Sequence, residues 1–103
     1  MARYVVGFPA SARMRETWLF RDADGGYRRV GPPLTGVTRF DVREEAEAAL
    51  LRFQARFPKG GAIAGGSVLT EADALRREAD GQEQPGVAAE LRAWADALDE
   101  LGR

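Results

Sequence analysis

The residue types that most often carry chemistry in proteins are missing from this chain, which contains no histidine and no cysteine. Without histidine there is no imidazole to act as a general base near neutral pH or as a transition-metal ligand. Without cysteine there is no thiol nucleophile, thiolate metal site or disulfide. The chemistry that remains belongs to carboxylates, hydroxyls, two tyrosines and Lys59. We therefore expect no catalytic residue, no metal site and no cofactor, and we predict that the protein is not an enzyme.

Three groups of carboxylates have spacings that could hold a cation or act as an acid and a base. Asp22 and Asp24 have the spacing that opens a calcium loop, but Gly26 and Arg28 stand where further ligands are needed, so a hairpin turn is favoured. Pairs on exposed helix faces are common, which makes a carboxylate-dependent enzyme the least favoured alternative. The two helical groups are Glu44 with Glu47, and Asp96 with Asp99 and Glu100.

A glycine-rich run at residues 60–67 has part of the pattern of a phosphate-binding loop. Gly60, Gly65 and Ser67 fall at the offsets of such a loop, but Gly66 replaces the lysine that would contact the phosphates. The run also follows a predicted helix, whereas a phosphate-binding loop follows a strand. We therefore predict a glycine-rich turn and a strand edge here.

Arginines alternate with aromatic residues through the first half of the chain. A sheet that exposes guanidinium groups beside aromatic rings can hold single-stranded nucleic acid through phosphate contacts and base stacking. The same residue types are enriched at protein interfaces, and rings that alternate along strands are most often core residues beside solvated arginines. All three interpretations stay open. The arginines that we single out as candidates for partner contact are Arg13, Arg15, Arg21, Arg28 and Arg29.

The net charge of −1 conceals two halves of opposite sign. Residues 1–43 contain eight arginines and four acidic residues, a balance of +4, and residues 44–103 contain seven basic and twelve acidic residues, a balance of −5. Charge segregation of this kind favours contact with a charged macromolecule.

The first 40 residues are expected to form a basic β-hairpin region. Bulky and β-branched residues alternate at 3–8, 16–21 and 27–30, and residues 22–26 supply a tight turn between the last two strands. Pro32 and Pro33 end the third strand, after which residues 37–40 form a loop or a fourth strand.

A core helix is predicted at residues 41–57, where the hydrophobic period changes to that of a helix. Asp41 is the predicted N-cap and Glu44 completes a capping box. Pro58 and the following glycines end the helix. Its apolar stripe consists of Val42, Ala46, Ala49, Leu50, Phe53 and Phe57.

A short strand at residues 61–69 and a helical region at residues 71–102 complete the chain. Thr70 is the predicted cap of the first of two helices, and Pro85 begins the second. The sequence therefore predicts one α+β domain over residues 1–103. It would contain a small antiparallel sheet of three or four strands in the order β-β-β-α-β, covered on one face by a helix and followed by a C-terminal helical pair.

The last helix carries an apolar seam at heptad-like spacing, formed by Val87, Leu91, Trp94, Leu98 and Leu101. Packing of this seam inside the domain is the favoured interpretation. The alternatives are a homodimer through this helix and insertion into the groove of a partner. Trp94 and Leu98 are therefore added to the candidates for partner contact.

The length of 103 residues, with 45% hydrophobic and 30% charged residues, is typical of a single globular domain. No apolar run is long enough to cross a membrane and the N-terminus lacks a secretory h-region, so we expect a soluble, cytoplasmic protein. Small size and an arginine- and alanine-rich composition without catalytic residues suggest a phage or mobile-element protein directed at nucleic-acid machinery. We predict a non-enzymatic inhibitor or adaptor that occupies a macromolecular surface, most simply that of a protein partner. A nucleic-acid-binding module is the alternative.

Overall fold

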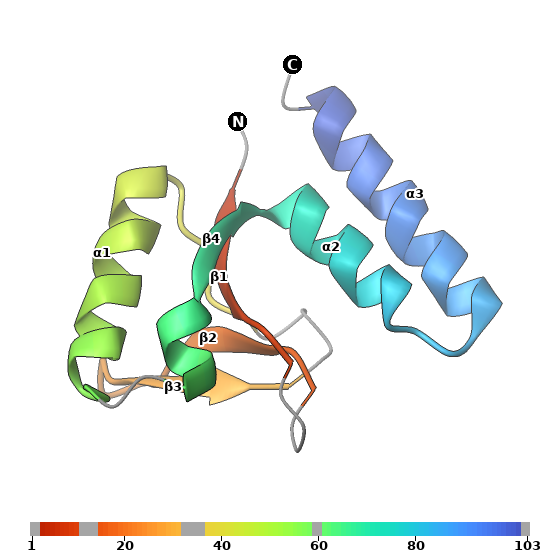
Figure 1. Cartoon of the computed structure of the whole chain (residues 1–103). Coiled ribbons are helices and arrows are strands. Elements are labelled where there is room, and N and C mark those ends of the chain that lie inside the picture. The colour runs from red at the N-terminus through yellow and green to blue at the C-terminus, as the bar shows by residue number, and fades with distance from the viewer. Residues whose placement is uncertain (1–2, 11–14, 32–36, 59–60, 102–103) are drawn as a thin grey trace.

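The computed structural model describes residues 3–10, 15–31, 37–58 and 61–101. It confirms the predicted α+β class, with a four-stranded antiparallel sheet and three α-helices (Figure 1). The strands are β1 (Tyr4–Phe8), β2 (Thr17–Arg21), β3 (Tyr27–Val30) and β4 (Ser67–Thr70). The helices are α1 (Arg43–Ala55), α2 (Glu71–Asp80) and α3 (Pro85–Leu101), and a 3-10 helix covers Gly61–Gly65.

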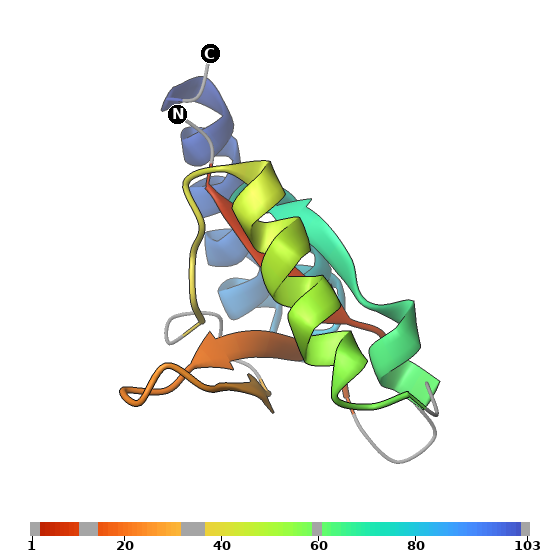
Figure 2. The same cartoon turned by 90° about the vertical axis from the view of Figure 1, so that its left-hand side faces the viewer.

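The sheet has the strand order β3-β2-β1-β4, which makes β1 a central strand although it begins the chain. β1 pairs with β4 along four residues but with β2 only at Gly7 and Phe8, so that β1 and β2 diverge beyond these pairs (Figure 2). Residues 37–40 enter the resulting gap. Phe40 exchanges two backbone hydrogen bonds of 2.8 Å with Tyr4, and the Thr38 N–H donates to the Leu19 carbonyl.

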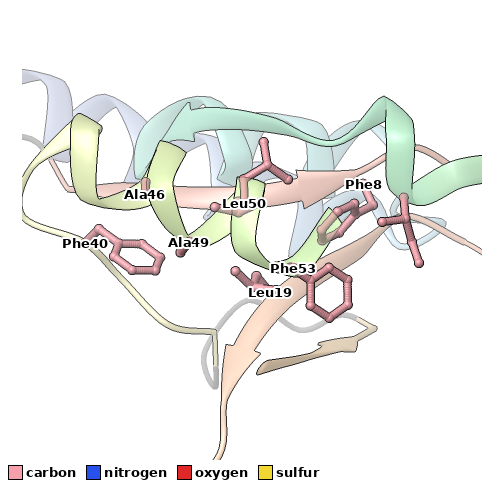
Figure 3. Close-up of a cluster of buried hydrophobic side chains, with 9 residues drawn as sticks. Phe8, Leu19, Phe40, Ala46, Ala49, Leu50 and Phe53 are labelled. Atoms are coloured by element: carbon pink, nitrogen blue, oxygen red, sulfur yellow. The ribbon is translucent and has the colours of Figure 1, made fainter. Parts of the chain in front are cut away.

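The alternation of side chains along the strands produces two cores on opposite faces of the sheet. Val6, Phe8 and Leu19 pack under α1, and the Phe8 and Phe53 rings lie 5.5 Å apart (Figure 3). Val5 and Trp18 point to the other face, where the α2–α3 pair covers them. The helix over one face is as predicted, and the C-terminal pair occupies the second face.

α1 is shorter than the predicted helix 41–57, and its N-cap prediction was wrong. The first helical residue is Arg43, the N-cap position belongs to Val42 in an extended conformation, and no side chain caps the helix. Because Phe40 is fixed by its bridge to β1, residues 41 and 42 form the bend into the helix, and Asp41 lies too early to cap it. Val42 and Phe57, predicted on the buried stripe, are exposed, whereas Ala46, Ala49, Leu50 and Phe53 are buried as predicted.

The predicted strand at residues 61–69 was also too long, because Gly61–Gly65 form a 3-10 helix and only Ser67–Thr70 join the sheet. Gly66 lies between these two elements against the core. A Cβ atom on Gly66 would lie 2.7 Å from Cε1 of Phe8 and 2.8 Å from Cδ1 of Leu50. The absence of a side chain therefore allows β4 to approach β1 and α1 closely.

β4 leads into α2 without an intervening loop. Thr70 is the last residue of β4 and also the N-cap of α2, with its hydroxyl accepting a hydrogen bond of 3.2 Å from the Asp73 N–H, as predicted. The Glu71 N–H donates to the Arg3 carbonyl. α2 then packs along α3, whose first residue is Pro85, also as predicted.

Candidate binding surfaces

The turn between β2 and β3 is a plain hairpin turn, as the sequence predicts. Gly25 has a φ of 90°, a left-handed conformation that glycine adopts without strain. The Asp24 carboxylate accepts a hydrogen bond of 3.0 Å from the Gly26 N–H, and the Asp22 carboxylate pairs with the Arg28 guanidinium at 3.0 Å. Both carboxylates of the turn therefore stabilise the hairpin.

The arginines of the hairpin are distributed over both of its faces. Residues paired across antiparallel strands point to the same face, and neighbours along a strand point to opposite faces. Arg28 pairs with Phe20, and its guanidinium lies 5.0 Å from the centre of that ring. Arg29 pairs with Leu19 on the α1 side and lies 5.8 Å from the centre of the Phe8 ring. Arg28 and Arg29 therefore do not share one flat basic surface.

Arg21 lies on the α1 side, where the hairpin and α1 border a hollow of about 350 Å³. Its guanidinium lies 6.0 Å from the centre of the Tyr27 ring. The hollow has mixed charge, because its wall includes Arg39 and Arg52 as well as Asp41 and Glu45. This arrangement lacks the uniform positive charge of a phosphate-binding groove.

Two arginine candidates remain to be placed, Arg13 and Arg15. Arg13 lies outside the described residues. Arg15 is exposed at a second hollow, of about 560 Å³, between β2 and the turn from α2 to α3. Glu16 and Arg77 form a 3.9 Å ion pair in its wall, and Glu78 and Asp80 add negative charge. This hollow is also mixed in charge.

Most aromatic rings of the first half belong to the core. Phe8 and Trp18 are fully buried, and Tyr4 and Tyr27 pack against the core under α1. Trp18 also requires the absence of a side chain at Gly7, where a Cβ atom would lie 2.6 Å from its ring. Base stacking needs an exposed ring face, which Phe8 and Trp18 do not offer, and the Tyr4 and Tyr27 rings are partly buried.

Arg39 forms a partly buried ion pair that the sequence did not reveal. Its guanidinium pairs with the Glu71 carboxylate and donates a second hydrogen bond, of 3.0 Å, to the Val37 carbonyl. The two charged side chains are 19% and 9% exposed, so the pair is shielded from water. It joins residues 37–40 to the first turn of α2.

The carboxylates near the C-terminus hold α2 and α3 together. Arg76 of α2 donates hydrogen bonds of 2.8 Å to Asp96 and 2.5 Å to Asp99, both in α3. The hydrogen bond to Asp96, followed by the one to Asp99, raises the pKa of the Arg76 guanidinium above its ordinary value. A second ion pair joins Arg92 to Asp80 at 3.0 Å. Asp96 and Asp99, whose spacing could also suit an acid and a base, therefore bind Arg76 and join the two helices.

The apolar seam of α3 divides into two sides. Leu91 and Leu98 are half-buried and pack against the core that contains Trp18, so Leu98 is turned mainly inward. Val87, Trp94 and Leu101 are exposed by 36%, 42% and 78%. Residues seven apart lie on nearly the same side of a helix. These three residues therefore form one exposed apolar stripe, which we call the α3 stripe.

Two alanines beside the α3 stripe extend its apolar character, and one glutamate lies among them. On the side away from the core lie the exposed residues Ala93 and Ala97, which lack charge, together with Glu90. Val87 and Leu101 were part of the predicted seam but were not singled out as contact candidates. Their spacing of seven from Trp94 on both sides was the signal that could have identified them.

Within the described residues, no helix has the length and apolar character needed to span a membrane, and no cluster of three or more acidic side chains is arranged to hold a metal ion. Comparison of the chain with protein-family models, curated proteins and solved structures found no match, so its function has to be inferred from its own surfaces.

Proposed function

We propose that this chain is a non-enzymatic binding protein that occupies a surface of a protein partner through the α3 stripe. The observation that carries the proposal is the exposure of Trp94 between Val87 and Leu101 on one side of a well-packed helix. Tryptophan is the residue type most enriched among those that dominate binding energy at protein interfaces.

An exposed apolar stripe raises the free energy of the protein in water, and a partner that covers the stripe removes this cost. Apolar surface in water is unfavourable by roughly 25 cal/mol per Å², and a tryptophan side chain can bury about 150–250 Å². Single exposed apolar residues are ordinary, but contiguous ones typically mark interaction sites. Val87, Trp94 and Leu101 follow one another at two-turn intervals on one side of α3, with the half-buried Leu91 and Leu98 beside them, and this apolar row supports a binding role for the stripe.

The stripe is also rigidly held, which supports binding with little ordering on association. Ala88 and Ala95 are buried against the rest of the domain, and Arg76 and Arg92 bridge α2 and α3. A surface that is ordered before binding loses less conformational entropy when it binds.

The experiment is affinity capture with the purified chain from a lysate of the cell that encodes it, performed with nuclease. Trp94→Glu places a charge in the stripe and should abolish retention of the partner. Leu51→Glu is the matched control, because Leu51 is 66% exposed on α1, far from the stripe. Calorimetry with the identified partner should then show at least a tenfold loss of affinity for Trp94→Ala.

Two outcomes would contradict the proposal. If the same proteins are captured by the wild type and by Trp94→Glu, the stripe is not the binding surface. If retention is lost on nuclease treatment and a labelled single-stranded oligonucleotide binds the purified chain in a salt-dependent way, the nucleic-acid alternative is supported instead. The circular dichroism spectra of Trp94→Glu and Leu51→Glu should match that of the wild type. A loss of binding then does not reflect a loss of folding.

A further inference from the structure

The α2–α3 pair is strongly acidic, in contrast to the rest of the chain. Residues 71–101 contain nine acidic and three basic residues, a balance of −6. Residues 1–70 contain eleven basic and seven acidic residues, a balance of +4. Glu71 is neutralised by Arg39, which leaves a surplus of five negative charges on the pair that carries the α3 stripe.

The basic residues of the pair are already engaged in ion pairs. Arg76 contacts Asp73, Asp96 and Asp99, Arg92 contacts Asp80, and Arg77 faces Glu16. Within the described part of the chain, Glu90 and Glu100 of α3 have no basic partner, and both are exposed. They are therefore available to a basic group from outside.

Glu90 lies directly beside the apolar stripe. It is three residues after Val87 and four before Trp94, and residues at these spacings are neighbours on a helix surface. Glu100 lies three residues after Ala97, farther round the same exposed side. A partner that covers Trp94 must therefore approach Glu90, and one that extends round the exposed side of α3 also reaches Glu100.

The shape of the stripe suits an elongated occupant. Val87 and Leu101 are fourteen residues apart, which corresponds to about 21 Å along the helix axis, or nearly four turns. A narrow apolar strip of this length matches the apolar stripe of a second helix packed alongside. The acidic surroundings disfavour nucleic acid, anionic lipid and a second α2–α3 pair with its own surplus of negative charge.

We propose that the α3 stripe binds a basic amphipathic helix of a partner protein. Apolar residues of that helix would cover Val87, Trp94 and Leu101, and its lysine or arginine side chains would pair with Glu90 and Glu100. This inference rests on the function proposed above and adds the chemistry of the partner.

The test uses two synthetic helical peptides of about 18 residues that share a leucine stripe. One carries lysine on its flanks and the other carries glutamate. Anisotropy of the labelled peptides reports binding to the full chain at low and at moderate salt. We expect the lysine peptide to bind, with affinity falling as salt rises, and the glutamate peptide to show no binding.

Substitutions separate recognition from general charge attraction. Trp94→Ala should weaken binding of the lysine peptide at least tenfold, and the double substitution Glu90→Gln with Glu100→Gln should weaken it several-fold at low salt only. The control is Glu44→Gln with Glu47→Gln, which removes the same charge from α1 and should leave binding unchanged.

The inference is overturned if neither peptide binds at low salt, if both bind equally, or if Trp94→Ala has no effect on the lysine peptide. It is also overturned if the chain forms a dimer that Trp94→Ala dissociates, because a second copy is then the occupant. Capture of a cellular partner that depends on Trp94 tests the proposed function separately. If a cellular partner is captured in a Trp94-dependent way but the lysine peptide does not bind, the proposed protein-binding function stands and a basic helix as its partner is rejected.

Discussion

Gly66 shows how a single missing side chain permits the contact between two elements. The space where its Cβ would stand is occupied by Phe8 and Leu50. We expect Gly66→Ala to lower the free energy of unfolding by about 1–3 kcal/mol through overpacking. The control is Gly86→Ala in the first turn of α3, where nothing lies within 4 Å of the added Cβ. It should raise stability by about 0.5–1 kcal/mol. Urea unfolding measures both changes, and equal effects would contradict the packing account.

Trp94 and Leu75 provide a second comparison between single residues. Leu75 of α2 is fully buried in the core that contains Trp18, whereas Trp94 is 42% exposed. Leu75→Ala should cost about 2–5 kcal/mol of stability, and Trp94→Ala only about 1 kcal/mol because little cavity is left behind. A loss for Trp94→Ala as large as that for Leu75→Ala would place the ring in the core and remove the basis of the binding proposal.

At the scale of elements, the ion pair between Arg39 and Glu71 fixes the 37–40 segment to α2. Because its side chains are only 19% and 9% exposed, removing one partner leaves a poorly hydrated charge. Glu71→Gln should therefore lower the free energy of unfolding by about 3 kcal/mol. Arg39→Met together with Glu71→Leu should recover part of that loss, since no charge is then left buried.

The pair of Arg43 and Glu47 in α1 is the matched control for this prediction. Its side chains are 53% and 52% exposed and lie four residues apart. Glu47→Gln should change stability by no more than about 0.5 kcal/mol. Thermal or urea unfolding of the two glutamine variants compares the pairs, and similar losses would contradict the role assigned to burial.

The contacts of Arg76 predict a local effect on α3. Arg76→Gln removes the charged bonds to Asp96 and Asp99, so amide hydrogen exchange in the C-terminal half of α3 should become faster. The exchange rates of β1 and β2 should stay unchanged, because the ion pairs of Arg76 are with residues of α2 and α3 and the sheet opens separately. Uniformly faster exchange in all elements would show that Arg76 supports the whole fold instead.

The elements that the sequence predicts well are those whose signal is local. The hairpin follows from the alternation in β2 and β3 around Gly25, and the cap of α2 follows from Thr70 and Asp73. Predictions failed where a distant contact decided the outcome. The bridge from Phe40 to Tyr4 displaces the start of α1 beyond Asp41, and the packing of Gly66 against Phe8 separates the 3-10 helix from β4.

The candidate surface was predictable only in part. Spacing identified the seam of α3, but periodicity alone does not reveal which of two adjacent sides packs against the domain. The structure turns Leu98 inward and leaves Trp94 outside. It also places Arg28 and Arg29 on opposite faces of the hairpin, as strand alternation requires.

At the scale of the whole molecule, the division into a basic sheet region and an acidic helical pair predicts the behaviour of the chain on its own. A dimer through α3 would bring together two helical pairs that each carry a surplus of negative charge. We therefore expect a monomer of 11.2 kDa at low ionic strength. Sedimentation at two protein concentrations measures the mass, and a dimer that persists at low salt would contradict this expectation.

The central place of β1 in the sheet makes folding depend on β4, a strand that is synthesised long after it. Tyr4 pairs with Thr70 and Gly7 pairs with Ser67, so the partners lie 60 to 66 positions apart in the sequence. Until residues 67–70 have emerged from the ribosome, β1 lacks its neighbour on one side, and both hydrophobic cores remain open to solvent. A nascent chain would therefore expose β1 as an unprotected edge until β4 is made, and such edges are prone to aggregate.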